Sequence, residues 1–372
     1  MSFLSHLGRN APLHLLLAIA VCGAFVSCTT PEPAWRHWTA PSAIRTLDIL
    51  SERHIRFAAA KGWVGETTDA GIQWNEQQWM APDSTFPSFR ASGWNGKAWF
   101  VASIASPGWI GRCTNLNTVP EWVHQDTNET VFFDAMAWWN PEEGLVFGDP
   151  VSGCLTLLVT RDGGNTWRAA DCENVPPHKP GEAGFAASNG NIALSGDTAW
   201  VFTGGKASRC LRSTDRGRSW EAFPLPIVQG EAMTGAFSGT FSSAQQGWVM
   251  GGNWEDPNNN RGNLAETHDG GETWNLIAEG TGPGYRSSIV HHPTFSDQLV
   301  AVGFSGIDVS LDRGRTWHHV SDSSRYVARF SPSGHALWLA GRHGLSKANW
   351  TSLVNDLQVN DPAPAIGTGK ST

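Results

Sequence analysis

Eight polar residues in this 372-residue chain carry side chains suited to binding an acidic ligand or to acid–base chemistry. They are Arg45, Arg90, Asp134, Glu182, Glu231, Tyr285, Arg286 and Tyr326. Three guanidinium groups can hold a carboxylate through paired hydrogen bonds. A tyrosine beside a glutamate, with a further carboxyl group across the scissile bond, is a set that catalysis can use. Binding and catalysis both stay open until the fold is known.

The elements that must position these residues are marked by a pattern that occurs five times, Ser/Thr-x-Asp-x-Gly-x-x-Trp. Its aspartates are Asp69, Asp162, Asp215, Asp269 and Asp312. In a tight turn the Asp carboxylate accepts backbone N–H groups, and the Gly supplies a residue with positive φ. The Trp buries a large ring between neighbouring sheets. We interpret the five aspartates as structural, against the alternatives of catalysis or metal binding.

The spacing of the pattern predicts the architecture. Trp167, Trp220, Trp274 and Trp317 follow one another at intervals of 53, 54 and 43 residues, and a degenerate unit with Trp122 lies before them. Periods of this size with β patterning indicate propeller blades of four strands each. The inner strands of blades two to six are expected to start at Phe89, Val131, Gly184, Ala232 and Arg286.

The last blade contains only three strands after the final repeat, which are Tyr326–Phe330, Ala336–Ala340 and Leu345–Asn349. The segment Ala34–Thr39 has no blade of its own, and its pairing with the last blade would leave no exposed sheet edge in the ring. We therefore predict an all-β fold, a seven-bladed β-propeller with four-stranded blades closed by an N-terminal strand, over residues 29–353. Residues 354–372 are expected to form a disordered tail.

In a propeller the inner strands begin around the central opening, and all eight polar residues lie at or just before such starts. Tyr285 and Arg286 are adjacent on an extended segment, so their side chains should point to opposite sides, which argues against a shared catalytic role. The segment 251–262 with Trp254 is either a recognition loop or an ordinary solvated turn. His291 and His292 face opposite sides of a strand, so we expect no metal site.

The repeated pattern resembles the Asp-box, or bacterial neuraminidase repeat, which implies a turn on the outer rim of a propeller blade. Over residues 34–350 the chain resembles the photosystem II stability/assembly factor family and its relatives in non-photosynthetic bacteria. The resemblance implies a non-enzymatic propeller that binds a membrane-protein assembly intermediate. For this chain we expect a monomer that binds a protein client or an acidic ligand at its central face.

Sialidases also carry the Asp-box, and they use three Arg, a Tyr nucleophile activated by a Glu, and an Asp acid. This implies an alternative, a sialidase-like glycoside hydrolase with Tyr285, Glu231 and Asp134 as catalytic residues. The Phe/Tyr-Arg-Ile-Pro segment expected near the start of a sialidase is absent, and Ser42–Thr46 is the nearest sequence. No Gly-x-Gly-x-x-Gly follows a strand and no haem motif occurs, so no cofactor is expected.

The first 28 residues are interpreted as a targeting segment, with Arg9 in its n-region and Leu13–Val26 as its apolar core. Phe25-Val26-Ser27-Cys28 resembles a lipobox, which implies lipidation of Cys28 and attachment to a membrane outside the cytoplasm. Plain secretion and an uncleaved anchor are the alternatives. The net charge of −8 provides no basic field, so nucleic-acid binding is not expected.

Four cysteines remain after the targeting segment. Cys154 and Cys172 are equidistant from Gly163 at the centre of the second repeat, so antiparallel pairing would place them side by side. We predict a disulfide there, in keeping with an oxidising compartment. Cys113 and Cys210 lie on different repeats and are expected to be buried free thiols.

Overall fold

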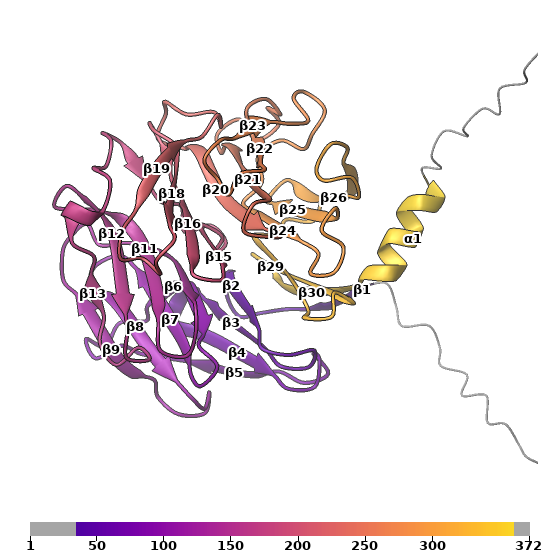
Figure 1. The fold of residues 1–372 in the computed structure, drawn as a ribbon. Coiled ribbons are helices and arrows are strands. Elements are labelled where there is room, and N and C mark those ends of the chain that lie inside the picture. The colour runs from indigo at the N-terminus through magenta and orange to yellow at the C-terminus, as the bar shows by residue number, and fades with distance from the viewer. Residues whose placement is uncertain (1–34, 361–372) are drawn as a thin grey trace, which may run out of the picture. The chain divides into compact units, whose positions relative to one another are not determined.

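The computed structural model describes residues 35–360, so the targeting segment with Cys28 lies outside the described residues. Seven antiparallel sheets follow one another around a central axis (Figure 1). The innermost strands of consecutive sheets are in contact, and the ring closes where β28 (Val327–Phe330) meets β2 (Ile44–Ile49). The seven-bladed β-propeller predicted from the repeats is confirmed.

The first four blades each contain four strands, which are named in order from the axis outward. Blade 1 has β2, β3 (Ile55–Ala59), β4 (Trp63–Thr67) and β5 (Asn75–Gln78), with the short 3-10 helix η1 (Ala60–Gly62) between β3 and β4. Blade 2 has β6 (Ser88–Trp94), β7 (Trp99–Ile104), β8 (Gly108–Cys113) and β9 (Glu121–Asp126). Blade 3 has β10 (Phe133–Trp138), β11 (Gly144–Val151), β12 (Cys154–Thr160) and β13 (Arg168–Ala169). Blade 4 has β15 (Ile192–Ser195), β16 (Thr198–Phe202), β18 (Arg209–Ser213) and β19 (Glu221–Pro224).

The remaining blades complete the ring. Blade 5 has β20 (Thr234–Phe241), β21 (Gly247–Asn253), β22 (Leu264–Thr267) and β23 (Asn275–Leu276). Blade 6 has β24 (Ser288–His291), β25 (Leu299–Gly303), β26 (Gly306–Ser310) and β27 (His318–Ser321). Blade 7 has β28, β29 (Ala336–Gly341), β30 (Gly344–Asn349) and, as its outer strand, β1 (Trp35–Trp38).

The N-terminal strand closes the ring as predicted. Strand β1 pairs antiparallel with β30, from Trp35 opposite Ala348 to Trp38 opposite Leu345. Figure 1 shows the first and the last strand of the chain in this sheet, β1 in indigo and β30 in yellow. Trp38 stacks on Trp338 with ring centroids 5.4 Å apart. The closing strand is therefore held by side-chain packing as well as by its ladder of hydrogen bonds.

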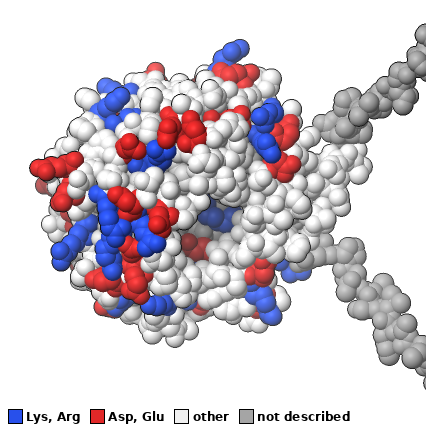
Figure 2. Space-filling view, in the orientation of Figure 1, with Lys and Arg blue, Asp and Glu red and all other residues white. Residues whose placement is uncertain are grey.

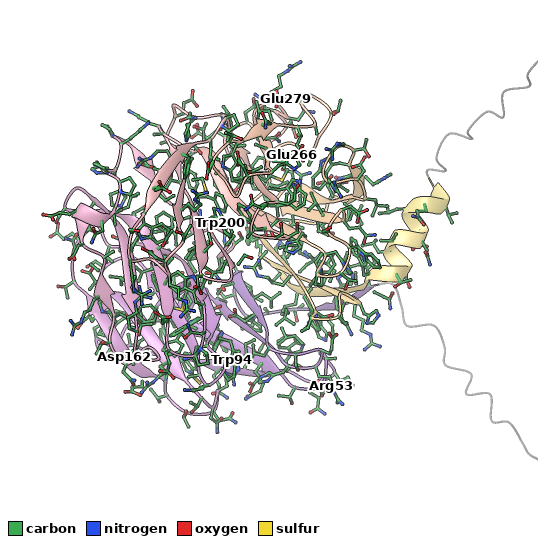
Figure 3. The ribbon with its side chains drawn as sticks, viewed as in Figure 1. Arg53, Trp94, Asp162, Trp200, Glu266 and Glu279 are labelled. Atoms are coloured by element: carbon green, nitrogen blue, oxygen red, sulfur yellow. A yellow bond between two sulfur atoms is a disulfide. The ribbon has the colours of Figure 1, made fainter. Side chains whose placement is uncertain are left out.

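The core of the fold consists of apolar layers between neighbouring blades. Between blades 4 and 5, Trp200 stacks on Phe241 with ring centroids 3.6 Å apart, and its indole N–H donates to the Gly270 carbonyl. Figure 3 labels Trp200 among the side chains that fill the space between these ribbons. The second strands, such as β7 and β29, are covered on both faces and are accordingly almost entirely apolar and buried.

The five repeats fold into one and the same turn. In the third copy, the Ser213 hydroxyl donates to Asp215 at 2.8 Å and accepts the Gly217 N–H at 2.7 Å. Asp215 also accepts the N–H of Ser219 at 3.0 Å. The corresponding three bonds occur in every copy. The fixed Gly has φ between 79° and 89° in all five turns, where a Cβ is unfavourable.

The sequence-based boundaries need correction at three places. Blade 4 begins at Ile192 and not at Gly184. Blade 5 is a six-stranded sheet, because the short strands β14 (Glu182–Ala183) and β17 (Gly204–Gly205) extend it toward the axis. The helix α1 (Trp350–Asn360) forms where a disordered tail was expected from residue 354, since Leu353 is 5% exposed and packs with the core of blades 6 and 7. Among residues 35–360 no helix is long and apolar enough to span a bilayer.

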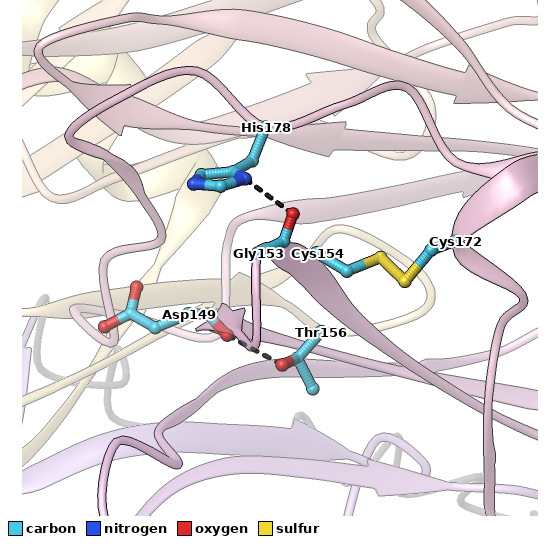
Figure 4. Close-up of a disulfide and its surroundings, with 6 residues drawn as sticks. All are labelled: Asp149, Gly153, Cys154, Thr156, Cys172 and His178. Carbon is cyan, nitrogen blue, oxygen red and sulfur yellow. Dashed lines mark hydrogen bonds between the residues drawn. A yellow bond between two sulfur atoms is a disulfide. The ribbon is translucent and has the colours of Figure 1, made fainter.

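The predicted disulfide between Cys154 and Cys172 is present (Figure 4). Cys154 begins β12, whereas Cys172 lies in the 3-10 helix η2 (Cys172–Asn174), because β13 ends at Ala169. His178 bonds to the carbonyl of Gly153 at 2.7 Å in the same region. The disulfide therefore fastens the start of the long connection between blades 3 and 4 to the propeller. The other two cysteines are buried free thiols, as expected.

Candidate binding pocket on the propeller axis

Antiparallel strands give the propeller two distinct faces. The inner strand of each blade begins on the face that also carries the turns between second and third strands, which we call the pocket face. The five repeats join third and fourth strands and lie on the opposite face, which we call the turn face. Residues Tyr285 and Tyr326, just before β24 and β28, therefore reach the pocket face together with the turn that carries Arg342 and His343.

These residues surround one hollow of about 410 Å³, the central pocket. Its lining consists of Arg45, Trp254, Tyr285, Ser287, Phe304, Ser324, Tyr326, Arg342 and His343. None of these described lining residues is Asp or Glu, so every ionisable side chain there other than the two tyrosines is basic. In the view of Figure 2 the blades surround a hollow, inside which both basic and acidic side chains are visible.

Arg45 is held in the central pocket by an aromatic ring and not by a carboxylate. Its guanidinium carbon lies 3.6 Å from the centroid of the Tyr326 ring, and one N–H points to the Ala187 carbonyl at 3.5 Å. Burial lowers the pKa of Arg45, and the nearby Tyr326 works against that shift. None of the ion pairs among residues 35–360 includes Arg45, so its positive charge is available to an anionic ligand.

One wall of the central pocket is a series of aromatic rings. Trp254, on the connection between β21 and β22, is 47% exposed and lies edge-on to Phe304 at 6.0 Å. The ring centroids of Phe304 and Tyr285 are 5.2 Å apart, and those of Tyr285 and Phe237 are 4.7 Å apart. Burial raises the pKa of Tyr285, which is 2% exposed and therefore a neutral hydroxyl donor at neutral pH. The wall offers apolar and stacking contacts beside the basic groups.

Behind the lining of the pocket lies a segment that the sequence patterns did not point to. Residues 184–191, which we call the plug, lie on the axis before blade 4 begins. Phe185 stacks on Phe237 at 3.8 Å, and the Ser188 hydroxyl donates to the Ser287 carbonyl at 2.6 Å. The plug therefore closes the channel that a propeller would otherwise have along its axis.

The plug is bonded to blades on every side of the axis. Its carbonyls accept from Arg45, Arg90 and Arg329, which belong to blades 1, 2 and 7. The Asn189 amide accepts from the Met136 N–H at 2.7 Å and donates to the Ser92 carbonyl at 2.9 Å. These contacts make the plug a common neighbour of blades 1, 2, 3 and 7, which include blades that are not consecutive in the ring.

Arg90 and Asp134 lie beside the plug and not in the pocket lining. Arg90 donates to the Ala186 carbonyl at 3.0 Å, and burial together with Arg45 lowers its pKa to about 10, so it stays charged at neutral pH. Burial and the neighbouring Asp149 raise the pKa of Asp134 well above its usual range. A Cβ on Gly184 would lie 2.2 Å from Asp134 Oδ2, so only glycine lets the plug approach this carboxyl group.

Three of the expected site residues lie elsewhere. Glu182 forms a buried ion pair with Arg209 at 2.7 Å and accepts from Thr203, so it is a structural contact. Arg286 pairs with Asp308 at 2.6 Å, on the opposite side of the strand from Tyr285. Glu231 is exposed in the loop before β20. Of Arg45, Arg90, Glu231, Tyr285 and Arg286, only Arg45 and Tyr285 line the central pocket, together with Tyr326.

The geometry that a sialidase-like mechanism requires does not form among the described residues. No hydrogen bond joins Tyr285 to Glu231, and Asp134 lies buried beside the plug. No group of three or more metal-ligating side chains occurs among residues 35–360. His291 and His292 hold separate bonds, His291 to Thr240 at 2.7 Å and His292 to Gly334 at 3.1 Å.

Comparison with known proteins places the fold. No protein-family model matches the chain, and a sequence search of curated proteins finds no match. The structure of YCF48 bound to D1 peptide superposes with a TM-score of 0.60 at 14% identity, covering 86% of this chain and 98% of that one. YCF48 from Cyanidioschyzon merolae superposes with a TM-score of 0.60 at 16% identity, covering 86% of this chain and 99% of that one.

A glycosidase gives a similar superposition. The GH74 xyloglucanase from Xanthomonas campestris has a TM-score of 0.61 at 15% identity, covering 85% of this chain and 53% of that one. This chain thus spans about half the length of that enzyme. At such identities the similarity concerns the fold. The chain is a seven-bladed β-propeller with a plugged axis and a basic, aromatic pocket on one face.

Proposed function

We propose that this propeller is a non-enzymatic binding protein that holds an acidic segment of a protein client in the central pocket. The observation that supports this most directly is the composition of the lining, which pairs Arg45, Arg342 and His343 with four aromatic rings and contains no carboxylate among the described residues. Guanidinium groups bind carboxylates in paired geometry, and aromatic rings hold the adjoining apolar parts.

The plug favours a binding role for a second reason. It bonds to Arg45 and Ser287 behind the lining of this pocket of about 410 Å³, so we expect a ligand to enter and leave on the pocket face. Both tyrosine hydroxyls belong to buried side chains that line this space, Tyr285 at 2% and Tyr326 at 7% exposure. A buried hydroxyl without an activating carboxylate serves as a hydrogen-bond donor rather than a nucleophile.

We further propose that the protein acts outside the cytoplasm as a lipoprotein attached to a membrane through Cys28. The lipobox-like sequence supports attachment, and the Cys154–Cys172 disulfide supports an oxidising compartment. Mass spectrometry of the membrane fraction tests this, because a lipidated protein would begin at a diacylglyceryl-modified Cys28. An unmodified mature N-terminus would contradict it.

The binding role is tested with fluorescein-labelled peptides that contain aromatic and acidic residues, measured by fluorescence anisotropy. Binding should weaken for peptides whose carboxylates are amidated and for the variants Arg45→Gln and Trp254→Ala. Photo-crosslinking from position 254 in native membranes would then identify the client. Turnover of a fluorogenic sialoside by the purified protein, lost in Tyr285→Phe, would overturn the proposal in favour of hydrolysis.

A further inference from the structure

On the turn face, the plug closes a second hollow of about 310 Å³, which we call the rear hollow. It lies at the far ends of the inner strands, whose residues Arg329, His291, Ser238 and Thr240 line it together with Asn189 of the plug. No Asp or Glu occurs in this described lining, and Arg329 is its one charged residue at neutral pH. Its lining differs from that of the central pocket in every residue.

Arg329 carries a charge that the described protein does not neutralise nearby. Its N–H groups donate to the carbonyls of Ala328 at 2.8 Å, Ser188 at 3.1 Å and Asn189 at 3.3 Å. None of the ion pairs among residues 35–360 includes it. Asp48 attracts it from a distance, but the Asp48 carboxyl accepts its hydrogen bonds from Ser92 and Trp99.

A cation in a desolvated position is costly unless it is paired. Carbonyl dipoles compensate only part of a full charge, and burial correspondingly lowers the pKa of Arg329. Burial likewise raises the pKa of Asp48, so its negative charge is also disfavoured. No carboxylate of the described residues lies within ion-pair distance of Arg329, so the carboxylate of a ligand could contact its guanidinium directly.

Neutral donors converge on the same hollow from two neighbouring blades. The Ser238 hydroxyl accepts the Ile289 N–H at 3.1 Å, which leaves its own proton for another acceptor. Burial, with His292 nearby, lowers the pKa of His291 to about 4, so the ring is neutral at pH 7. If the Thr240 hydroxyl donates to Nδ1 across their 2.7 Å contact, the proton of His291 resides on Nε2.

The remaining lining is apolar, with Met136, Ile192, Ile289 and Phe241 around the polar end. An inorganic ion such as phosphate would leave these walls without contacts, and a large ligand would exceed the volume. A guanidinium beside neutral donors suits a single carboxylate, and the apolar walls suit a short hydrocarbon chain.

We propose that the rear hollow is a second binding site, independent of the central pocket, that takes a small organic monocarboxylate with its carboxylate on Arg329. Ser238 and His291 supply further hydrogen bonds to it. The hydrocarbon part lies against Met136 and Phe241.

The test is isothermal titration of the full chain with acetate, propionate and butyrate at constant ionic strength, with chloride, phosphate and methylammonium as controls. We expect one site, with affinity rising from acetate to butyrate. Arg329→Gln should lower the affinity for butyrate at least tenfold, and Arg329→Lys should lower it less. Arg313→Gln, an exposed arginine on the same face, should leave it unchanged.

Because Arg329 also bonds to the plug, a second variant is needed, and His291→Phe keeps an aromatic ring at this position but removes the ring nitrogens and their bond to Thr240. We expect this variant to lower the affinity for butyrate about threefold to tenfold. Equal heats for chloride, phosphate and butyrate would overturn the proposal. So would unchanged butyrate affinity in His291→Phe and Arg329→Gln, or a loss confined to Arg45→Gln, which would place the carboxylate in the central pocket.

Discussion

The guanidinium carbon of Arg45 lies 3.6 Å from the centroid of the Tyr326 ring, and this pair places one positive charge in the central pocket. Arg45 comes from blade 1 and Tyr326 from the start of blade 7, so the contact exists only because the ring of blades closes. A cation held over an aromatic face keeps its hydrogen-bonding edge free for a ligand. An ion pair would have used that edge.

This pair leads to a prediction about affinity. Arg45→Gln should lower the affinity for an acidic peptide by about tenfold or more, because a hydrogen-bonded charge is lost. Tyr326→Leu should weaken the same peptide, since Arg45 loses the ring that holds it, whereas Tyr326→Phe keeps the ring and should lose less. Fluorescence anisotropy measures all three, and equal effects of Leu and Phe at position 326 would contradict the role of the ring.

The plug leads to a prediction about stability. Asn189→Ala should lower the free energy of unfolding by about 2–4 kcal/mol, because it removes two short hydrogen bonds and leaves buried backbone groups of Ser92 and Met136 without a partner. Urea unfolding measures the change. Asn355→Ala, on the exposed side of α1, is the matched control and should change it little. A loss below about 0.5 kcal/mol for Asn189→Ala would show that the plug is not a structural hub.

The repeat turns should be structural and remote from binding. Asp215→Ala should lower stability by about 1–3 kcal/mol through its lost turn bonds. Burial opposes ionisation of Asp215, but hydrogen bonds from Ser219 and Ser213 outweigh it and lower its pKa to about 2. Peptide affinity should survive, since the turns lie on the face opposite the pocket. Lost affinity with an unchanged melting temperature would refute this assignment.

The disulfide should stabilise the connection that carries the plug. Replacing Cys154 and Cys172 with serine should lower the free energy of unfolding by about 3 kcal/mol, the size expected for a closed loop of similar length. Calorimetry under non-reducing conditions measures it. Adding reductant should lower the melting temperature of the wild type toward that of the double variant, but leave the variant itself unaffected.

Acid should weaken the fold through His292. Its Nδ1 accepts the N–H groups of Thr294 and Phe295, so protonation there breaks both bonds, and burial lowers its pKa. A base whose pKa is lower in the folded state binds fewer protons there than when unfolded. Its contribution to stability is therefore present above about pH 6.5 and is lost as the pH falls below it.

Calorimetry between about pH 7.5 and 4.5 tests the histidine effect, since that range spans the ordinary pKa of a histidine. Asp134 works in the opposite direction, because burial raises its pKa and favours the folded state as the pH falls. The quantity to follow is therefore the difference in stability between the wild type and His292→Gln at each pH. This difference should shrink as the pH falls. His343→Gln, at an exposed hairpin turn, should follow the wild type at every pH.

The architecture of this protein could be predicted from the sequence alone. Each repeat turn depends on bonds within eight consecutive residues, and the Trp spacing then counts the blades, so local information was sufficient. The closing strand followed from the strand missing in blade 7, and the disulfide followed from hairpin symmetry about Gly163. All of these features depend on short-range spacing or on one pairing rule.

Two irregular spacings in the sequence mark the insertions that build the site. The intervals ending at Trp220 and Trp274 are 53 and 54 residues, about ten longer than the 43 before Trp317. The first contains the plug and the second contains the loop with Trp254. Residues of both insertions line the hollows on the axis, so the unequal periods marked the segments that shape these hollows.

The membership of the site, in contrast, depends on contacts between distant blades. Among the eight polar candidates, Arg45, Tyr285 and Tyr326 reach the central pocket, while Glu182 and Arg286 are taken up by buried partners from other strands. Whether a charged side chain at a strand start faces a ligand or an internal counter-ion depends on what lies across the axis. That neighbour comes from a distant part of the chain, so no local pattern in the sequence identifies it.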